Sequence, residues 1–91
     1  MFVKLVEVDT SYDRYRLRET LVNAGSILSI TQEDPSEKLI NESANMGMSP
    51  HASYSRIVLN TSYGGDRFML VVGSPDSIRT KIGKERGILK G

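Results

Sequence analysis

The sequence predicts an α+β domain, mainly β, in which about five strands form an antiparallel sheet or a small barrel beside one short C-terminal helix. Three observations support this fold class. Short apolar runs rich in β-branched residues are separated by turn residues, two of these runs flank a glycine-containing loop, and a helix start signal follows them. With 91 residues, the chain is expected to form a single domain. We place that domain at residues 1–83 and a basic flexible tail at residues 84–91.

The first strand is expected at residues 1–8. Its β-favouring side chains, such as Val3, Leu5 and Val8, occupy both alternating faces. Burial of both faces is typical of a central strand. Residues 9–11 combine Asp, Thr and Ser, which favour a turn.

The second strand is expected at residues 14–22, where apolar and basic side chains alternate. Tyr15, Leu17 and Leu21 share one face. Arginines occupy the opposite face at every second position. A third short strand is expected at residues 27–30.

Residues 34–54 form an irregular insertion in this scheme. Asp34 and Pro35 resemble a helix start with a cap and a first-turn proline, so a short helix is expected from about Pro35 to Ala44, closed near Gly47. Residues 46–50 are expected to be poorly ordered, or to gain order only on binding.

A β-hairpin is the most distinct element of the sequence. Two apolar runs, at residues 55–61 and 67–72, are separated by five residues that include paired glycines. Such a hairpin can leave an exposed strand edge.

The C-terminal helix is expected to begin after Ser74, which is a favoured N-cap residue followed by proline. Ile78 and Ile82 are four residues apart and therefore share the face that packs on the sheet. Gly83 predicts the end of this helix, because glycine adopts the left-handed conformation of a helix stop.

Composition excludes several classes of protein. The chain has no cysteine, so it has neither a disulfide nor a thiolate metal site, and it fits a reducing compartment. No apolar run approaches the roughly 20 residues of a membrane span, so we expect a cytoplasmic protein without a membrane partner. Residues 1–78 carry a net charge of −3, and residues 79–91 a net charge of +4.

The order of these elements resembles the FlbD-type small flagellar-associated proteins and similar short phage or bacterial proteins. The matching segments are residues 3–5, 21–23, 27–30, 56–59 and 71–78. The resemblance covers about two-thirds of the chain and implies a small β-rich fold. The chain departs from the family pattern in the long 34–54 segment and in Gly73, where the family has an acidic residue.

The sequence contains no recognisable catalytic, cofactor or metal site, and no small-molecule substrate is evident. His51 has no co-ligand at a useful spacing and is interpreted as a solvated loop residue. The paired glycines at residues 64–65 join two strands and not a strand and a helix, so a hairpin turn is favoured over a phosphate-binding loop. Acidic residues gather at residues 33–42 without a calcium-binding pattern, which favours a solvated face.

The sharpest surface feature is the row of Arg14, Arg16 and Arg18. Alternate residues of a strand are about 6.6–6.8 Å apart, which is close to the spacing of successive phosphates on one nucleic-acid strand, roughly 6–7 Å. The simpler interpretation is a solvated or salt-bridged face balanced by Asp9, Asp13 and Glu19, and a protein interface is a third interpretation. The complete set of candidate nucleic-acid or partner contacts is Arg14, Arg16, Arg18, Arg79, Lys81, Lys84 and Arg86.

These observations predict a non-enzymatic binding or accessory protein that acts through a protein interface, with another copy of itself or with a different protein. The alternative is a small nucleic-acid-binding regulator that uses the arginine row and the basic tail.

Overall fold

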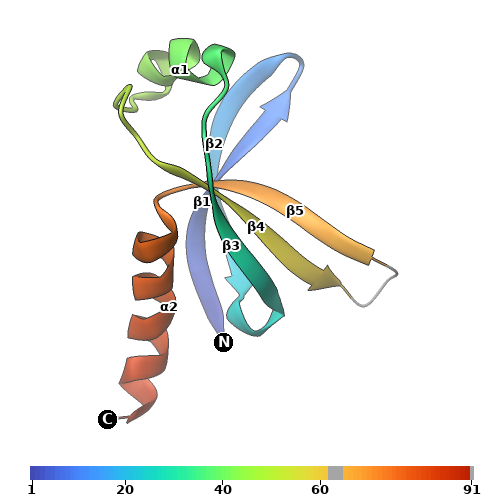
Figure 1. Cartoon of the computed structure of the whole chain (residues 1–91), viewed down its shortest axis with the longest axis vertical. Helices are drawn as coiled ribbons and strands as arrows, with labels where there is room; N and C mark the ends of the chain where they lie inside the picture. The colour runs from blue at the N-terminus through green and yellow to red at the C-terminus, as the bar shows by residue number, and fades with distance from the viewer. Residues whose placement is uncertain (62–64, 91) are drawn as a thin grey trace.

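The computed structural model describes residues 1–61 and 65–90, apart from the side chains of residues 61, 66 and 85–90. It contains one five-stranded antiparallel sheet with the strand order β2-β1-β5-β4-β3 (Figure 1). The mainly β fold is therefore confirmed, as an open sheet with two edge strands. The strands are β1 (Phe2–Ser11), β2 (Arg14–Asn23), β3 (Ile27–Glu33), β4 (Tyr54–Thr61) and β5 (Gly65–Val72).

The sheet consists of two long hairpins that cross. Strands β1 and β2 pair along their whole length, and β4 pairs with β5 in the same way. A single register pair, Glu7 opposite Val71, joins β1 to β5. Beyond this point the two hairpins point in different directions (Figure 1).

Because the hairpins diverge, the two faces of the sheet are buried at different places. Val3 and Leu5 of β1 belong to a core cluster with Ile57 and Val71. Val8 points to the opposite face and belongs to a second cluster. The expected burial of both faces of the first strand is confirmed, and β1 lies inside the sheet between β2 and β5.

Helix α2 (Pro75–Lys90) covers the first cluster. Ser74 caps the helix as predicted, since its Oγ accepts a hydrogen bond from the Ser77 backbone N–H at 3.1 Å. Ile78 is buried in the first cluster and Ile82 packs against it. No helix in the described part of the chain is long and apolar enough to span a bilayer.

The predicted end of this helix at Gly83 is wrong. The helical backbone continues to Lys90, so the secondary structure of most of the predicted 84–91 tail is helix, and residue 91 lies outside the described residues. Gly83 does not adopt the left-handed conformation that a glycine stop requires. The residues that follow, Lys84 to Arg86, are good helix formers and favour continuation. The flexibility of this segment stays a prediction.

Helix α1 (Glu37–Ser43) covers the second cluster, where Leu39 packs with Val8 and Tyr54. The helix expected in the insertion is therefore present, but it starts two residues later than expected. Its cap is Ser36, whose Oγ accepts a hydrogen bond from the Leu39 backbone N–H at 3.1 Å. Asp34 and Pro35 precede this cap.

Part of the remaining 34–54 segment also packs on the sheet, and the poor order expected at residues 46–50 stays a prediction. Met46, in the short 3-10 turn Ala44–Met46, and Met48 both pack against the second cluster. Gly47 has a φ of 74° and closes the turn where predicted. The Met48 backbone N–H donates to the Ser43 carbonyl at 2.8 Å, which holds the connection in place.

The first hairpin turns at Tyr12 and Asp13, so the turn predicted at residues 9–11 is wrong. Both residues have positive φ, 52° and 62°, which is the geometry of a two-residue type I′ turn. That turn normally uses Asn-Gly, whereas a bulky side chain in the left-handed region is strained. The side chain of Tyr12 is almost fully exposed and makes no packing contact that offsets the strain.

The double variant Tyr12→Asn/Asp13→Gly is therefore expected to be more stable than the parent chain, by about 1–2 kcal/mol in the free energy of unfolding. Urea denaturation measures this difference. Tyr12→Ala is the matched control, because it removes the exposed ring and keeps the unfavourable φ. Equal stability of the double variant and this control would contradict strain at the turn.

Two isoleucine-to-alanine variants, one in each helix, test the packing of α2 on the sheet. Ile78→Ala should lower the free energy of unfolding by about 2–4 kcal/mol, because it opens a cavity under α2. Ile40→Ala in α1 is the control, since Ile40 is 41% exposed and should cost less than about 1 kcal/mol. Similar losses in the two variants would mean that α2 does not cover the core as described.

Candidate functional site

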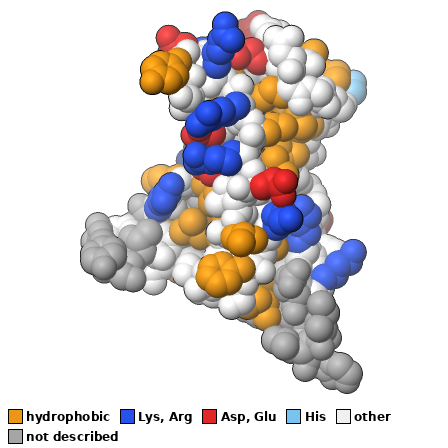
Figure 2. All heavy atoms as spheres, turned by 180° about the vertical axis from the view of Figure 1, so that it is seen from behind, with side chains coloured by type: hydrophobic (Ala, Val, Ile, Leu, Met, Phe, Trp, Pro, Cys, Tyr) orange, Lys and Arg blue, Asp and Glu red, His pale blue; other side chains and the backbone are white. Residues whose placement is uncertain are grey.

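The arginine row lies on β2, where the register places it beside acidic residues of β1. Arg16 is opposite Asp9 and Arg18 is opposite Glu7. Arg16 Nε lies 3.1 Å from Asp9 Oδ2, and Arg18 Nη2 lies 3.2 Å from Glu7 Oε1. Figure 2 shows positive and negative side chains interleaved over this part of the surface. The charges of these two arginines are therefore largely balanced.

Arg14 differs from the other two arginines. It is exposed at the start of β2, opposite Ser11, and no carboxylate among the described residues lies within ion-pair distance of it. Of the acidic residues expected to balance the row, only Asp9 does so. Glu19 pairs instead with Lys4, at 3.3 Å.

The candidate contacts on α2 form a separate group. Arg79, Lys81 and Lys84 are exposed on the helix, and Arg79 lies 3.9 Å from Asp76. The side chain of Arg86 lies outside the described residues. Figure 1 shows α2 extending away from the end of the β1–β2 hairpin that carries Arg14. The structure therefore does not join the predicted contacts into one basic surface.

The two edges of the sheet differ strongly. The edge formed by β2 carries three arginines and Glu19, and charged side chains protect an edge against added strands. Helix α1 also reaches this edge. The Tyr15 backbone N–H donates to Glu42 Oε1 at 3.5 Å, and the Tyr15 hydroxyl lies 3.3 Å from Ser36 Oγ.

The other edge, β3, has no such protection. It pairs with β4 on one side, and the Ile27 N–H at its start donates to the Ala24 carbonyl. No other backbone hydrogen bond from a described segment reaches β3. Residues 27–32 carry no charge, and the terminal Glu33 is paired with Arg56 at 2.9 Å. A bulge between Ile27 and Ser29 is the one irregularity of this edge.

Exposed apolar side chains accompany the β3 edge. Leu28 is 56% exposed on β3, and Phe68 is 63% exposed on β5. Val58 of β4 is opposite Phe68 on one side and Ser29 on the other, and Leu28 lies at the bulge without a register partner. The Arg56 guanidinium lies 5.7 Å from the centre of the Phe68 ring. Sequence reasoning missed this surface, because the 55–72 hairpin was expected to provide the free edge, whereas both of its strands lie inside the sheet.

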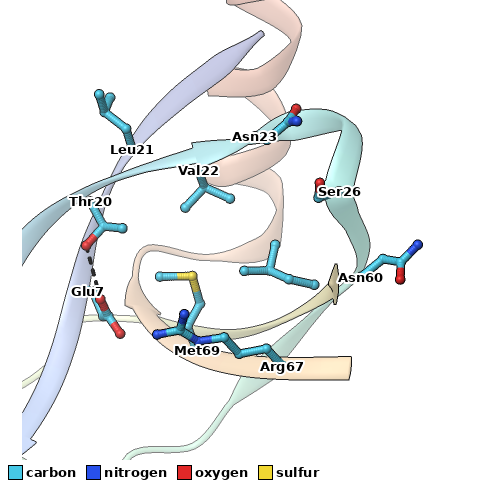
Figure 3. A pocket seen from close by; sticks show the side chains of 10 residues that line it. Glu7, Thr20, Leu21, Val22, Asn23, Ser26, Asn60, Arg67 and Met69 are labelled. Atoms are coloured by element: carbon cyan, nitrogen blue, oxygen red, sulfur yellow. Dashed lines mark hydrogen bonds between the residues drawn. The ribbon is translucent and has the colours of Figure 1, made fainter. Parts of the chain in front are cut away.

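A cavity of about 250 Å³ lies between β2 and β5, where the two hairpins diverge (Figure 3). Val22, Leu59 and Met69 give it an apolar lining, and Arg67 and Glu7 are its charged residues. Sequence reasoning did not find this cavity, because it depends on how the hairpins cross.

The remaining candidates do not gather into a site. His51 is exposed in its loop, and its backbone N–H donates to Ser49 Oγ. The acidic residues at 33–42 are dispersed, since Glu33 pairs with Arg56 and Glu42 faces Tyr15. Within the described ranges, no three His, Cys, Asp or Glu residues are close enough to hold a metal ion.

The ion pairs predict different roles for two neighbouring arginines. Arg18→Ser should lower the free energy of unfolding by about 1–2 kcal/mol, because the Glu7 side chain is only 12% exposed and would lose its cationic partner. Arg14→Ser, the control, should change it by less than about 0.5 kcal/mol. Thermal and urea denaturation at low and high salt measure both. Equal losses would argue against a structural role for Arg18.

Comparisons of the chain with protein-family models, with curated proteins and with solved structures give no match. The resemblance to FlbD-type proteins therefore stays a prediction.

Proposed function

We propose that this chain is a non-enzymatic accessory protein that binds another polypeptide by adding a strand to the β3 edge. The observation that carries the proposal is the uncharged outer edge of β3, where the Ile27 N–H donates to the Ala24 carbonyl and the backbone of residues 28–32 has no protein partner beyond the β4 ladder among the described residues. Main-chain hydrogen bonds supply affinity in this mode of binding, and neighbouring side chains supply specificity. Leu28 is an exposed apolar side chain on the edge strand itself, and Val58 and Phe68 form an apolar cross-strand pair on the two neighbouring strands.

A second copy of the chain is the first partner to consider. Antiparallel pairing of two β3 strands places no like charges opposite each other, because residues 27–32 are uncharged. The β2 edge instead carries four charged side chains, which oppose the addition of a strand. A domain of this size also buries a limited core, which association would supplement.

The charge arrangement favours protein over nucleic acid as the partner. Nucleic-acid affinity comes largely from cations that displace counterions at phosphates. Arg16 and Arg18 are already paired with Asp9 and Glu7. Their contribution to such binding would require breaking those pairs. A cytoplasmic location belongs to the same proposal, on the basis of the cysteine-free sequence.

The proposal predicts that a charge on β3 abolishes association while the same charge on β2 does not. Leu28→Lys should reduce self-association measured by size-exclusion chromatography with light scattering over micromolar concentrations, because a lysine on an edge strand opposes strand addition. Leu21→Lys is the matched control, since Leu21 is an exposed leucine on the other edge strand. Hydrogen exchange should show slower exchange of β3 amides in the associated form.

A monomeric mass at every concentration would exclude the second copy as partner. Self-association that is insensitive to Leu28→Lys would contradict the β3 edge itself. The nucleic-acid alternative gives a different result: binding to oligonucleotides that weakens steeply with salt and is lost when Arg14, Arg16 and Arg18 are all replaced by serine. Absence of oligonucleotide binding at low salt would end that alternative.

A further inference from the structure

The cavity between β2 and β5 combines an apolar floor with Arg67, a cation that has no ion-pair partner among the described residues. In Figure 3, Val22 points down from β2 and Met69 rises from β5 toward it, while the Arg67 side chain runs along β5 and brings its guanidinium beside Met69. The amides of Asn23 and Asn60 point outward from its rim. Arg67 therefore dominates the polar chemistry inside the cavity, together with Glu7 and Thr20 at one end.

The other charged side chains around the cavity are paired with one another, so the positive charge of Arg67 is not balanced by a described carboxylate. Glu7 Oε1 accepts hydrogen bonds from Arg18 Nη2 at 3.2 Å and from Thr20 Oγ1 at 3.0 Å. With Arg16 bound to Asp9, these four charged side chains cancel one another. No carboxylate among the described residues lies within ion-pair distance of Arg67. A cation would gain little from Glu7, whereas an anion would find an unpaired guanidinium.

The size and lining of the cavity restrict what could enter. Val22 and Met69 are buried, and Leu59 lies opposite Arg67 in the β4–β5 register, so the floor is apolar. A volume of about 250 Å³ equals the liquid volume of roughly eight water molecules. This space suits a small ring or short chain, below the size of a typical drug.

We propose that this cavity binds a small carboxylate whose apolar ring or chain rests on Val22, Leu59 and Met69 and whose carboxylate pairs with Arg67. Guanidinium and carboxylate form the strong, two-pronged hydrogen bonds for which arginine is well suited. None of the lining residues belongs to β3, so this site is tested separately from the β3 edge.

Three probes of equal ring size test the charge requirement: benzoate, benzyl alcohol and benzylamine. Each is titrated into the full-length chain labelled with nitrogen-15, and the backbone amide shifts of Thr20, Val22 and Met69 are followed. Benzoate should shift these amides in a saturable way, with a Kd on the order of 1 mM for a ligand so small. The alcohol and the amine should bind at least about ten times more weakly, because neither offers Arg67 an anion.

Arg67→Gln should weaken benzoate binding about tenfold or more, and Arg67→Lys, which keeps the charge, should retain part of it. Arg79→Gln is the control and should leave the Kd unchanged, because Arg79 is an exposed arginine on α2 that does not line the cavity. Leu28→Lys should also leave it unchanged, which separates this test from that of the β3 edge. Equal binding of the three probes, no saturable shift, or an unchanged Kd in Arg67→Gln would overturn the proposal.

Discussion

The crossing of β1 and β5 at a single register pair is the constraint on which the rest of the structure depends. Among the described residues, Glu7 and Val71 are the register pair that joins β1 to β5, and the two hairpins diverge beyond it. Each face is therefore buried over a different part of the sheet, one under α2 and the other under α1 with its flanking turns. The long 34–54 segment is needed for this reason: without Leu39, the Val8 and Tyr54 side chains would lie on an uncovered surface.

The same crossing creates the two candidate binding surfaces. The divergence of the hairpins leaves space between β2 and β5, and this space is the cavity that Arg67 lines. It also leaves β2 and β3 as the two edges of the sheet. The short 3-10 turn Ala24–Ser26 links these strands in sequence, but they do not pair with each other to close the sheet. Charged side chains and α1 protect the β2 edge, so the β3 edge is the accessible one.

Much of the fold could be predicted from local patterns, and less of the candidate site. Alternation placed Arg14, Arg16 and Arg18 on one face of β2, and the start of α2 followed from Ser74 and Pro75. The end of α2 could not be predicted, because a glycine stop is decided by backbone conformation and not by the presence of glycine. Strand order, and with it the free β3 edge and the cavity, depends on long-range pairing that a periodic pattern does not encode.

The register of β1 and β2 also determines which arginines of the row are paired with carboxylates. In the sequence, the row consists of three cations at the spacing of successive phosphates. In the structure, the register places two of them opposite carboxylates, which occupy alternate positions of β1. The Glu7 side chain is mostly buried, so Arg18 satisfies a carboxylate that would otherwise lack a charged partner. After this pairing, the unpaired guanidinium groups among the described arginines are Arg14, at the start of β2, and Arg67, in the cavity. These two guanidinium groups come from different strands, and Arg67 is the one that lies beside the apolar lining of the cavity.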